Sequence, residues 1–588
     1  MVGSIRAWTR NVRAARPRRR QLGASFSVRS PSGGAALQHG MEYQDAIKML
    51  NSLQSNASTL EQVRQGCTQP LLQLQAMRVF LERSGLSLEE LDCLNIIHVT
   101  GTKGKGSTCA FTERILRNHG FRTGFYSSPH LVHVRERIRI DGQPITKGLF
   151  TKYFWDVYSR LDSTKAAYGG SMPAYFRFLT LLTFHVFLRE KACIHDECDV
   201  VTLLLGHLQV DVALIEVGIG GAYDCTNILR KPWVCGISSL GIDHTSILGD
   251  SIEKIAWQKG GIFKPGVPAY TVRQPEGPMK VLQERAREIG CPLCVCSDLE
   301  EYEAPGRPLR LGLAGQHQRS NAALALQLSW SWLQRHHVAG NWWPVLSKEA
   351  ASVSMAMPFP LSSATIKGLE DTEWPGRGQI LRHGFLTYYL DGAHTMRSMQ
   401  ACVRWFSQEA SSQERALWGP VVRVLLFNTT GERDSAALLK LLAPCQFDFA
   451  VFSPNIIETV GSNEDPPNPS VENMLARCLD NQSSWWSMSG QRERLEAERV
   501  IPCGVPLVAG LRNNALVFPC ILSALQWISQ GRDPVLMLPK EHVMQTHPAV
   551  ASRALPLREA AGIQVLVTGS LHLVGGALRH LDPAMLSG

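Results

Sequence analysis

The feature that most constrains this chain is a glycine-rich loop between an apolar segment and a helical pattern. Residues 95–99 are apolar enough for a buried strand, and residues 109–118 show the apolar spacing of a helix. Between them lies the loop Gly101-Thr-Lys-Gly-Lys-Gly-Ser-Thr108. Glycines let backbone N–H groups close around phosphate oxygens, and a helix N-terminus adds its positive dipole end. The layout therefore predicts a phosphate-binding loop.

The loop departs from the usual pattern, in which four residues separate two glycines and Ser or Thr follows the lysine directly. In this chain Lys105 becomes the phosphate lysine, and Ser107 or Thr108 supplies the hydroxyl that can ligate Mg²⁺. A glycine-rich turn with a solvated lysine is the alternative. The strand before the loop and the helix after it favour nucleotide phosphate.

The basic charge of the chain is concentrated at its start. The formal net charge is +9, and the first forty residues hold eight arginines and no Asp or Glu, so the remainder carries only +1. Such a segment is typical of a mitochondrial transit peptide, with a disordered basic tail as the alternative. Because a helical pattern follows Met41, a start there predicts a cytoplasmic form as well. The balance gives no support for a nucleic-acid partner.

Length and periodicity predict two α/β domains. A chain of 588 residues exceeds the usual size of one core. Candidate strands at 95–99, 210–217, 234–239 and 267–272 alternate with helices over residues 41–312, which predicts a phosphate-loop ATPase-type domain with a mostly parallel sheet. A second series over residues 313–588 opens with a helix near Gln316 and has strands at 386–390, 421–427, 447–452 and 564–568. It predicts a smaller Rossmann-like α/β domain.

Other segments are less regular. Residues 336–363 and 456–502 lack clear periodicity, so we expect surface excursions there. The longest near-apolar stretch, 178–188, is too short for a bilayer and predicts a core helix, with no integral membrane segment. The one tight cysteine group contains Cys291 and Cys294 without a second pair at zinc spacing, so we expect reduced thiols and no zinc.

Acidic and basic side chains follow the candidate strands. Glu216 ends one strand beside several glycines, where a carboxylate can hold Mg²⁺ directly or through water; an ordinary loop carboxylate is the alternative. His244 follows the next strand, and taken alone it is better explained as a hydrogen-bonding histidine, because Mg²⁺ prefers oxygen ligands. Lys259 and Lys264 flank an apolar turn, which indicates either anion binding or plain surface lysines.

Nine segments form a pattern of known order and spacing: His98-Val-Thr-Gly-Thr-Lys-Gly-Lys-Gly-Ser-Thr108, Ser127-Ser-Pro-His-Leu131, Val134-Arg-Glu-Arg-Ile138, Glu216-Val-Gly-Ile-Gly-Gly221, Gly241-Ile-Asp-His-Thr245, Trp257-Gln-Lys-Gly-Gly-Ile-Phe-Lys264, Trp374-Pro-Gly-Arg377, Leu390-Asp-Gly-Ala-His394 and Leu566-Val-Thr-Gly-Ser-Leu-His572. From about Met41 to its end, the chain resembles the eukaryotic folylpolyglutamate synthases, members of the Mur-ligase superfamily.

The resemblance implies an ATP-dependent amide ligase that adds L-glutamate to the γ-carboxyl of a tetrahydrofolate through an acyl phosphate, releasing ADP and phosphate. It implies reduced folates, L-glutamate and ATP as substrates, with Mg²⁺ and optionally a monovalent cation such as K⁺. We expect a monomer in the mitochondrial matrix, where inner-membrane association is an option, and in the cytoplasm.

The resemblance also implies roles for particular residues. Those expected to bind ATP are Gly104, Lys105, Gly106 and Ser107 at the phosphates, and His317, Asn321, Arg377 and Asp391 from the second domain. The family's metal positions fall on Ser128, Glu216 and His244. Catalytic roles fall on Lys105, on Lys259, which matches a lysine carbamoylated in relatives, and on His394, near the incoming glutamate. The stretch 127–131 and the loop 218–227 would border the folate.

One segment departs from the family. Residues 193–209 are extra and lie just before the strand that carries Glu216, so a register error there would remove the metal ligand. A catalytically impaired nucleotide- or folate-binding isoform is therefore one alternative. A ligase that also accepts dihydropteroate is a second alternative, and a phosphate-loop kinase is a third.

Overall fold

Two sheets organise the computed structural model, which describes residues 42–54, 70–190, 210–302, 309–337, 354–431, 433–458, 471–488, 514–536 and 548–586. The expected transit peptide (1–40) and the extra segment (193–209) lie outside these residues. In the described part the first sheet has the order β4-β3-β2-β5-β1-β6-β7-β8-β9 and the second the order β10-β11-β15-β12-β13-β14.

The first sheet contains β1 (Ile96–Thr100), β2 (Thr123–Tyr126), β3 (Ile138–Ile140), β4 (Gln143–Pro144), β5 (Val212–Glu216), β6 (Val234–Ile237), β7 (Ala269–Thr271), β8 (Leu293–Cys296) and β9 (Ser354–Ala356). The helices of this part are α1 (Tyr43–Ser52), α3 (Pro70–Arg83), α4 (Leu88–Asp92), α5 (Lys105–Asn118), α6 (Lys147–Thr164), α7 (Tyr175–Arg189), α8 (Thr245–Leu248), α9 (Ile252–Gly260), α10 (Glu276–Ile289), α11 (His317–His337) and α12 (Ser363–Glu370).

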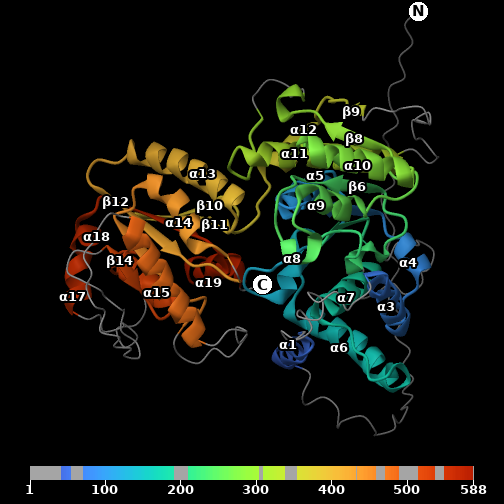
Figure 1. Ribbon diagram of the computed structural model, residues 1–588, viewed down its shortest axis with the longest axis horizontal. Coiled ribbons are helices and arrows are strands. Elements are labelled where there is room, and N and C mark those ends of the chain that lie inside the picture. The colour runs from blue at the N-terminus through green and yellow to red at the C-terminus, as the bar shows by residue number, and fades with distance from the viewer. Residues whose placement is uncertain are drawn as a thin grey trace, which may run out of the picture. The chain divides into compact units, whose positions relative to one another are not determined.

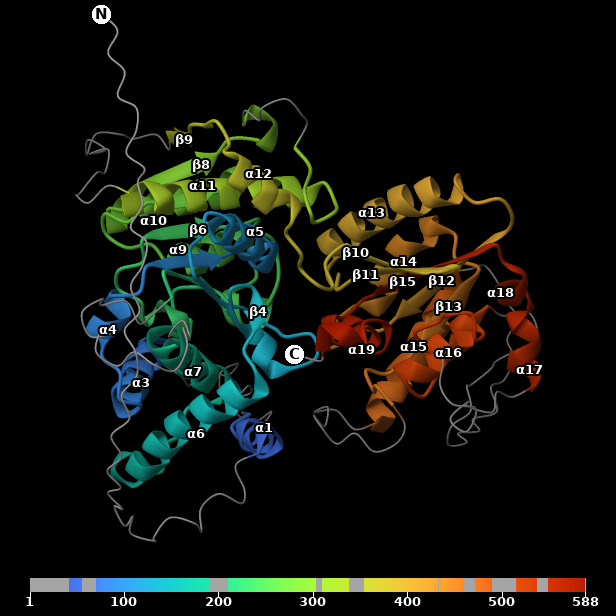
Figure 2. The ribbon, with the colours of Figure 1, turned by 180° about the vertical axis from the view of Figure 1, so that it is seen from behind.

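The second sheet contains β10 (Gln379–His383), β11 (Leu386–Asp391), β12 (Val421–Phe427), β13 (Phe449–Phe452), β14 (Ala515–Val517) and β15 (Gly562–Thr568). Its helices are α13 (Met396–Glu414), α14 (Ser435–Leu442), α15 (Val471–Met488), α16 (Ile521–Ser529), α17 (Pro548–Ala551), α18 (Leu555–Glu559) and α19 (Leu571–Leu581) (Figures 1 and 2).

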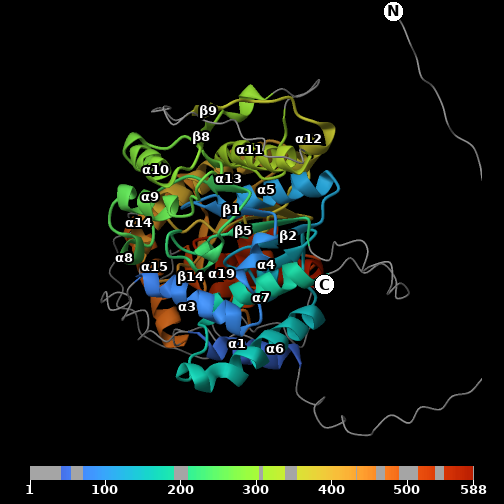
Figure 3. The ribbon, with the colours of Figure 1, turned by 90° about the vertical axis from the view of Figure 1, so that its right-hand side faces the viewer.

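Helices cover both faces of the first sheet, and its central strands β1, β2, β5 and β6 are buried along their whole length. Ile97 and Val99 pack against α5 and α11, whereas Ile96 points to the other face, where α7 and α6 pack. Figure 3 shows this sequence of layers, with α11 and α5 on one side of β1 and α7 and α6 on the other. All neighbouring strands are parallel except the pairs with β3 or β4.

The second sheet has the same layered design. Helices α13, α14 and α15 pack on one face, where the strand residues include Leu425 and Phe452. Helices α16 and α19 pack on the other face, where the strand residues include Val424 and Val451. Only the edge pair β10–β11 is antiparallel among its described strands. The predicted α/β class with a mostly parallel sheet is confirmed.

Two segment predictions differ from the structure. Helix α11 was expected to open the second domain, but it packs on α5 of the first sheet, and β9 pairs with β8. The division between the sheets therefore falls between α12 and β10, not near residue 313.

Residues 456–502 were expected to be an excursion, yet they contain the helix α15, which buries Cys478 and Trp485 against β13 and β14. In the described part no helix is both long and apolar enough to cross a membrane.

The packing of α11 can be tested with a pair of tryptophans. Trp332 is fully buried, with its ring 4.8 Å from Phe121 and 5.5 Å from Trp233, whereas Trp418 is 99% exposed. We expect Trp332→Ala to lower the free energy of unfolding by about 3–5 kcal/mol, because it leaves a large cavity. Trp418→Ala should change it by less than about 0.5 kcal/mol. Urea denaturation followed by circular dichroism measures both, and equal effects would contradict the packing described.

Candidate active site

The predicted phosphate loop joins β1 to α5 and depends on glycine at two positions. Gly104 precedes the helix with φ of +92°, and a Cβ there would lie 2.2 Å from Asn321 Oδ1. Gly101 has φ of +151°, and a Cβ there would lie 1.9 Å from Ser238 Oγ. Both positions combine a conformation that side chains rarely adopt with a close neighbour, so the loop can form only with glycine there.

The loop is fixed to the end of the neighbouring strand β6. The N–H groups of Thr102 and Lys103 donate to the Ser239 carbonyl at 3.0 and 3.1 Å. The Ser238 hydroxyl donates to the Lys103 carbonyl at 2.9 Å, and the Thr102 hydroxyl donates to the Gly241 carbonyl at 3.0 Å. These bonds hold the loop backbone in place, so its side chains can respond to a ligand without the backbone moving.

Two lysine ammonium groups converge on one carbonyl oxygen of this loop. Lys105 Nζ and Lys259 Nζ donate to the Gly101 carbonyl at 3.1 and 2.8 Å. Lys259 comes from α9 and is 3% exposed; burial, and next the charge of Lys105, lowers its pKa well below the usual value. Lys105 Nζ also lies 4.0 Å from Glu216 Oε1. The Lys105 ammonium at this position favours an anion as ligand.

Glu216 ends β5 beside the loop and is 4% exposed. Its Oε2 accepts the backbone N–H of Ser128 at 3.1 Å. Burial raises the pKa of this carboxyl, and the charge of Lys105 acts in the opposite direction. Val99 of β1 pairs with Glu216, so the carboxylate stands at the carboxyl end of its strand, where the sequence placed it.

His244 completes the predicted metal set from the loop after β6. It has φ of +52° and precedes α8, and its N–H donates to Asp243 Oδ1 at 3.0 Å. Ser128, Glu216 and His244 line the same cavity, whose volume is about 1320 Å³. Among the described residues no three His, Cys, Asp or Glu side chains form a metal cluster. A buried carboxylate in such a cavity fits Mg²⁺, which keeps several water or phosphate ligands.

Helix α11 brings amide side chains to the phosphate loop. Gln318 Nε2 donates to Ser107 Oγ at 3.4 Å, and Asn321 Nδ2 donates to Gln318 Oε1 at 2.8 Å. The sequence analysis expected Asn321 to come from the second domain. Because α11 packs on α5, Asn321 instead reaches the loop from the first sheet. Gln318 was not predicted, although it stands in the same polar helix start as His317 and Asn321.

Asp391 brings the second sheet to the cavity. It ends β11, and its two carboxylate oxygens accept the N–H groups of Gly378 and Ala393, both at 2.9 Å. Burial lowers the pKa of Arg377 while the charge of Asp391 raises it, and the same two effects act on His317. All three predicted side chains line the same cavity.

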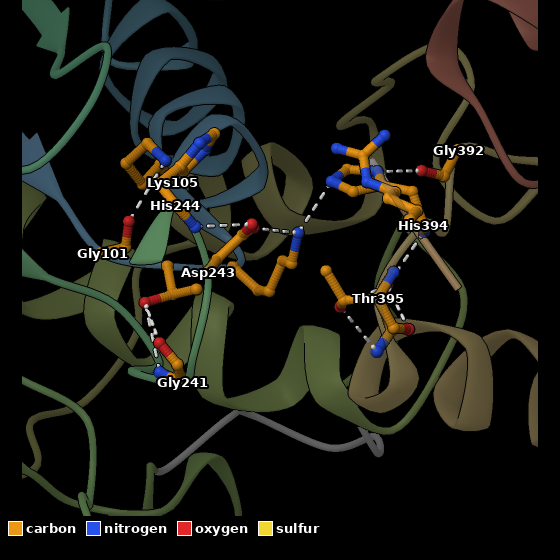
Figure 4. A network of polar contacts seen from close by, with 12 residues as sticks. Gly101, Lys105, Gly241, Asp243, His244, Gly392, His394 and Thr395 are labelled. Carbon is orange, nitrogen blue, oxygen red and sulfur yellow. Dashed lines mark hydrogen bonds and ion pairs between the residues drawn. The ribbon is translucent and has the colours of Figure 1, made fainter. Parts of the chain in front are cut away.

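Lys103 connects the two sheets across the cavity, and sequence reasoning missed it. Its Nζ lies 3.0 Å from Asp243 Oδ2 and 2.9 Å from His394 Nε2. Figure 4 shows Asp243 and His394 facing one another from the two sides. Burial lowers the pKa of Lys103 to about 8, against the charge of Asp243. Burial, and next Lys103, lowers the pKa of His394 to about 3, so its imidazole is neutral at pH 7.

The fold and the cavity define a class: a two-domain phosphate-loop protein in which both domains line one site. No family model matches the chain. It is 57% identical to the mitochondrial folylpolyglutamate synthase of Homo sapiens over 93% of this chain and 92% of that protein. It is 36% identical to the folylpolyglutamate synthase of Candida albicans over 92% of this chain and 96% of that protein. The chain belongs to the folylpolyglutamate synthase family.

Solved structures show the same fold. The Mycobacterium tuberculosis folylpolyglutamate synthase complexed with ADP superposes with a TM-score of 0.62 at 20% identity, covering 92% of this chain and 99% of that one. An FPGS–AMPPCP–folate complex superposes with a TM-score of 0.58 at 18% identity, covering 92% and 100%. At these identities the likeness concerns the fold alone.

A glycine pair tests whether the loop geometry controls anion binding. Gly104→Ala should weaken ADP binding about tenfold or more, because it adds left-handed strain and a clash with Asn321. Gly120 has φ of +90° with open space around it, so Gly120→Ala adds the strain at the far end of α5 without the clash. Calorimetric titration with ADP should show a loss only for Gly104→Ala. An equal loss in both variants would mean that the loop is not the binding site.

Proposed function

We propose that this chain is an ATP-dependent ligase that adds L-glutamate to the γ-carboxyl of tetrahydrofolates. The single observation that carries the proposal is that the phosphate loop and the end of β11 line one cavity of about 1320 Å³. One side can hold a nucleotide, and the other can hold a second substrate. The 57% identity to the human enzyme named folylpolyglutamate synthase supplies the substrate class.

We assign the ATP phosphates to the loop. The residues that would bind them are Gly104, Lys105, Gly106 and Ser107. The Lys105 ammonium, which lines the cavity and donates to the Gly101 carbonyl, supports this assignment because an anion bound at the loop would be a partner for its charge. The residues that would contact the rest of the nucleotide are His317, Asn321, Arg377 and Asp391, all of which line the cavity.

Mg²⁺ would be held by Glu216 and Ser128, with His244 as a third ligand. The support is the burial of the Glu216 carboxylate, which raises its pKa, because a cation bound beside a buried carboxylate stabilises the charged form. When bound, Mg²⁺ would neutralise charge on the transferring phosphoryl group. Carbamoylation of Lys259 fits its site, because its lowered pKa favours the neutral amine that reacts with carbon dioxide. A site for K⁺ has no specific support in the side chains described here.

The residues fit the chemistry of amide synthesis. A carboxylate does not react with an amine at pH 7 until it gains a leaving group, and transfer of the γ-phosphoryl group supplies one as an acyl phosphate. The Lys105 ammonium is placed to offset charge that builds on this group. The glutamate amine then attacks near His394. Water must be excluded meanwhile, and a cavity lined by residues of both sheets suits this need.

The competing functions find less support. An impaired isoform would require a displaced Glu216, but this residue pairs in register with β1 and accepts the Ser128 N–H. A kinase would not need a second sheet that brings Asp391 and His394 to the cavity. Use of dihydropteroate as a further substrate is left for the assay to decide.

The proposal also includes the domain organisation, the cellular location and the oligomeric state of the protein. We propose a phosphate-loop domain that ends between α12 and β10, followed by the smaller α/β domain. The mammalian relatives are named mitochondrial, which supports a mitochondrial form. A cytoplasmic form started at Met41, a monomeric state, and matrix location with inner-membrane association belong to the same proposal.

The direct test is the reaction itself. The chain started at Met41 is mixed with tetrahydrofolate, Mg-ATP and L-glutamate, and ADP release and glutamate incorporation into folate are followed in parallel. We expect equal amounts of ADP and folate-glutamate product. ADP release without product, or nucleotide binding without ADP release, would contradict the proposal. Replacing tetrahydrofolate by dihydropteroate tests the broader ligase.

The metal-binding role of Glu216 can be distinguished from the general effect of replacing a buried carboxylate. We expect Glu216→Gln to lower kcat on the order of 100-fold and to raise the Mg²⁺ concentration needed for half-maximal rate, because a ligand charge is lost. Glu113 is also 4% exposed but is held by Arg117 and Thr123, outside the cavity. Glu113→Gln should leave the Mg²⁺ dependence unchanged. An unchanged Mg²⁺ dependence in Glu216→Gln would refute the metal assignment.

A further inference from the structure

The contact between Lys103 and its two partners has the geometry of an ammonium-binding site. Asp243 Oδ2 and His394 Nε2 lie 3.0 and 2.9 Å from a single ammonium nitrogen. The acceptors come from different sheets, Asp243 from the loop after β6 and His394 from the loop after β11. Figure 4 shows both side chains directed at the space between them.

The protonation of His394 makes it an acceptor. Its Nδ1 lies 2.7 Å from the Gly392 carbonyl oxygen, which can only accept, so Nδ1 carries the proton. The Nε2 lone pair is therefore directed at the Lys103 ammonium. A carboxylate oxygen and an imidazole lone pair thus receive two of the three N–H bonds of that group.

The Lys103 side chain can leave these acceptors while its backbone stays in place. Its N–H and carbonyl are both held by the residues that follow β6, Ser239 and Ser238. Its side chain is 27% exposed and lines the cavity together with Lys105. A phosphate bound at the loop offers the ammonium a new anionic partner. The acceptor pair then becomes free for another ammonium.

We propose that Asp243 and His394 form the binding site for the α-ammonium of the incoming amino acid, and that Lys103 occupies this site until the substrate replaces it. The inference rests on the proposed function, to which it adds the residues that recognise the amino group. An α-ammonium has the same charge and the same three N–H donors as the lysine head that it replaces.

A nearby cation fits the other part of an α-amino acid. Arg433 is close enough to Asp243 and to His394 to interact with both electrostatically. Its guanidinium is held by the Thr430 carbonyl at 2.9 Å and the Thr430 hydroxyl at 3.1 Å. The positive charge of Arg433 would also favour a carboxylate on the ligand whose ammonium is bound by this acceptor pair.

Two ligands that differ only in the amino group test the site. L-glutamate and glutarate both carry two carboxylates, but glutarate lacks the ammonium. The chain started at Met41 is titrated with each by calorimetry, with and without AMPPCP. Lys103→Met keeps the side-chain length and removes the competing ammonium, so the glutamate-to-glutarate affinity ratio without nucleotide should rise about tenfold, the size of one charge-assisted hydrogen bond.

The acceptor side is tested with Asp243→Asn, which should lower the same ratio about tenfold in the presence of AMPPCP. Lys280 forms an exposed pair with Glu276 at 2.7 Å on α10, and Lys280→Met is the control that should leave the ratio unchanged. A ratio that falls in Lys103→Met, or that stays constant in Asp243→Asn, overturns the proposal. So does a failure of glutamate to bind any variant with or without nucleotide.

The results of these titrations are independent of whether the protein catalyses the proposed ligase reaction. If glutamate binds with the expected ratios but is not joined to tetrahydrofolate, the amine site stands and the folate assignment fails. If folate is glutamylated while the ratios do not respond to either variant, the ligase stands and the amine is bound elsewhere.

Discussion

The Gly101 carbonyl oxygen, with the Lys105 and Lys259 ammonium groups at 3.1 and 2.8 Å, is the interaction on which the site depends. It ties the loop after β1 to the start of α5 and to the buried face of α9. The Lys105 ammonium lies 4.0 Å from the Glu216 carboxylate, too far for a hydrogen bond, so its charge is only partly offset. In the proposed function a bound anion completes this balance, because buried charges need partners.

The parallel sheets explain how distant residues reach this anion. In a parallel sheet the carboxyl ends of adjacent strands meet at one edge, and ligands bind there. Lys105 follows β1, Glu216 ends β5 and Asp243 follows β6, which are neighbours in the order β5-β1-β6. Asp391 ends β11 of the second sheet by the same rule. Each sheet thus presents its functional edge to the same cavity.

This rule also explains what the sequence could predict. The apolar runs revealed β1, β5, β6 and β12, and the strand ends then indicated which side chains meet. The assignment of α11 failed because alanine and leucine cover it on several sides, and such a helix does not indicate which sheet it packs on. Helix α15 was missed because five consecutive polar residues, 480–484, interrupt its apolar spacing. The Lys103–His394 contact joins residues 291 apart, and only side-chain geometry reveals it.

The true position of α11 changes how the two halves of the site divide their work. Asn321 and Gln318 stand with Lys105 on one sheet, so most of the phosphate environment is complete within the first domain. The second sheet adds Asp391 and His394. Its contact with the loop is made by Lys103, a group that can exchange both its partners. In the proposed function, phosphate binding and amine recognition use separate acceptors but share one lysine, so a ligand on either side changes what is available to the other.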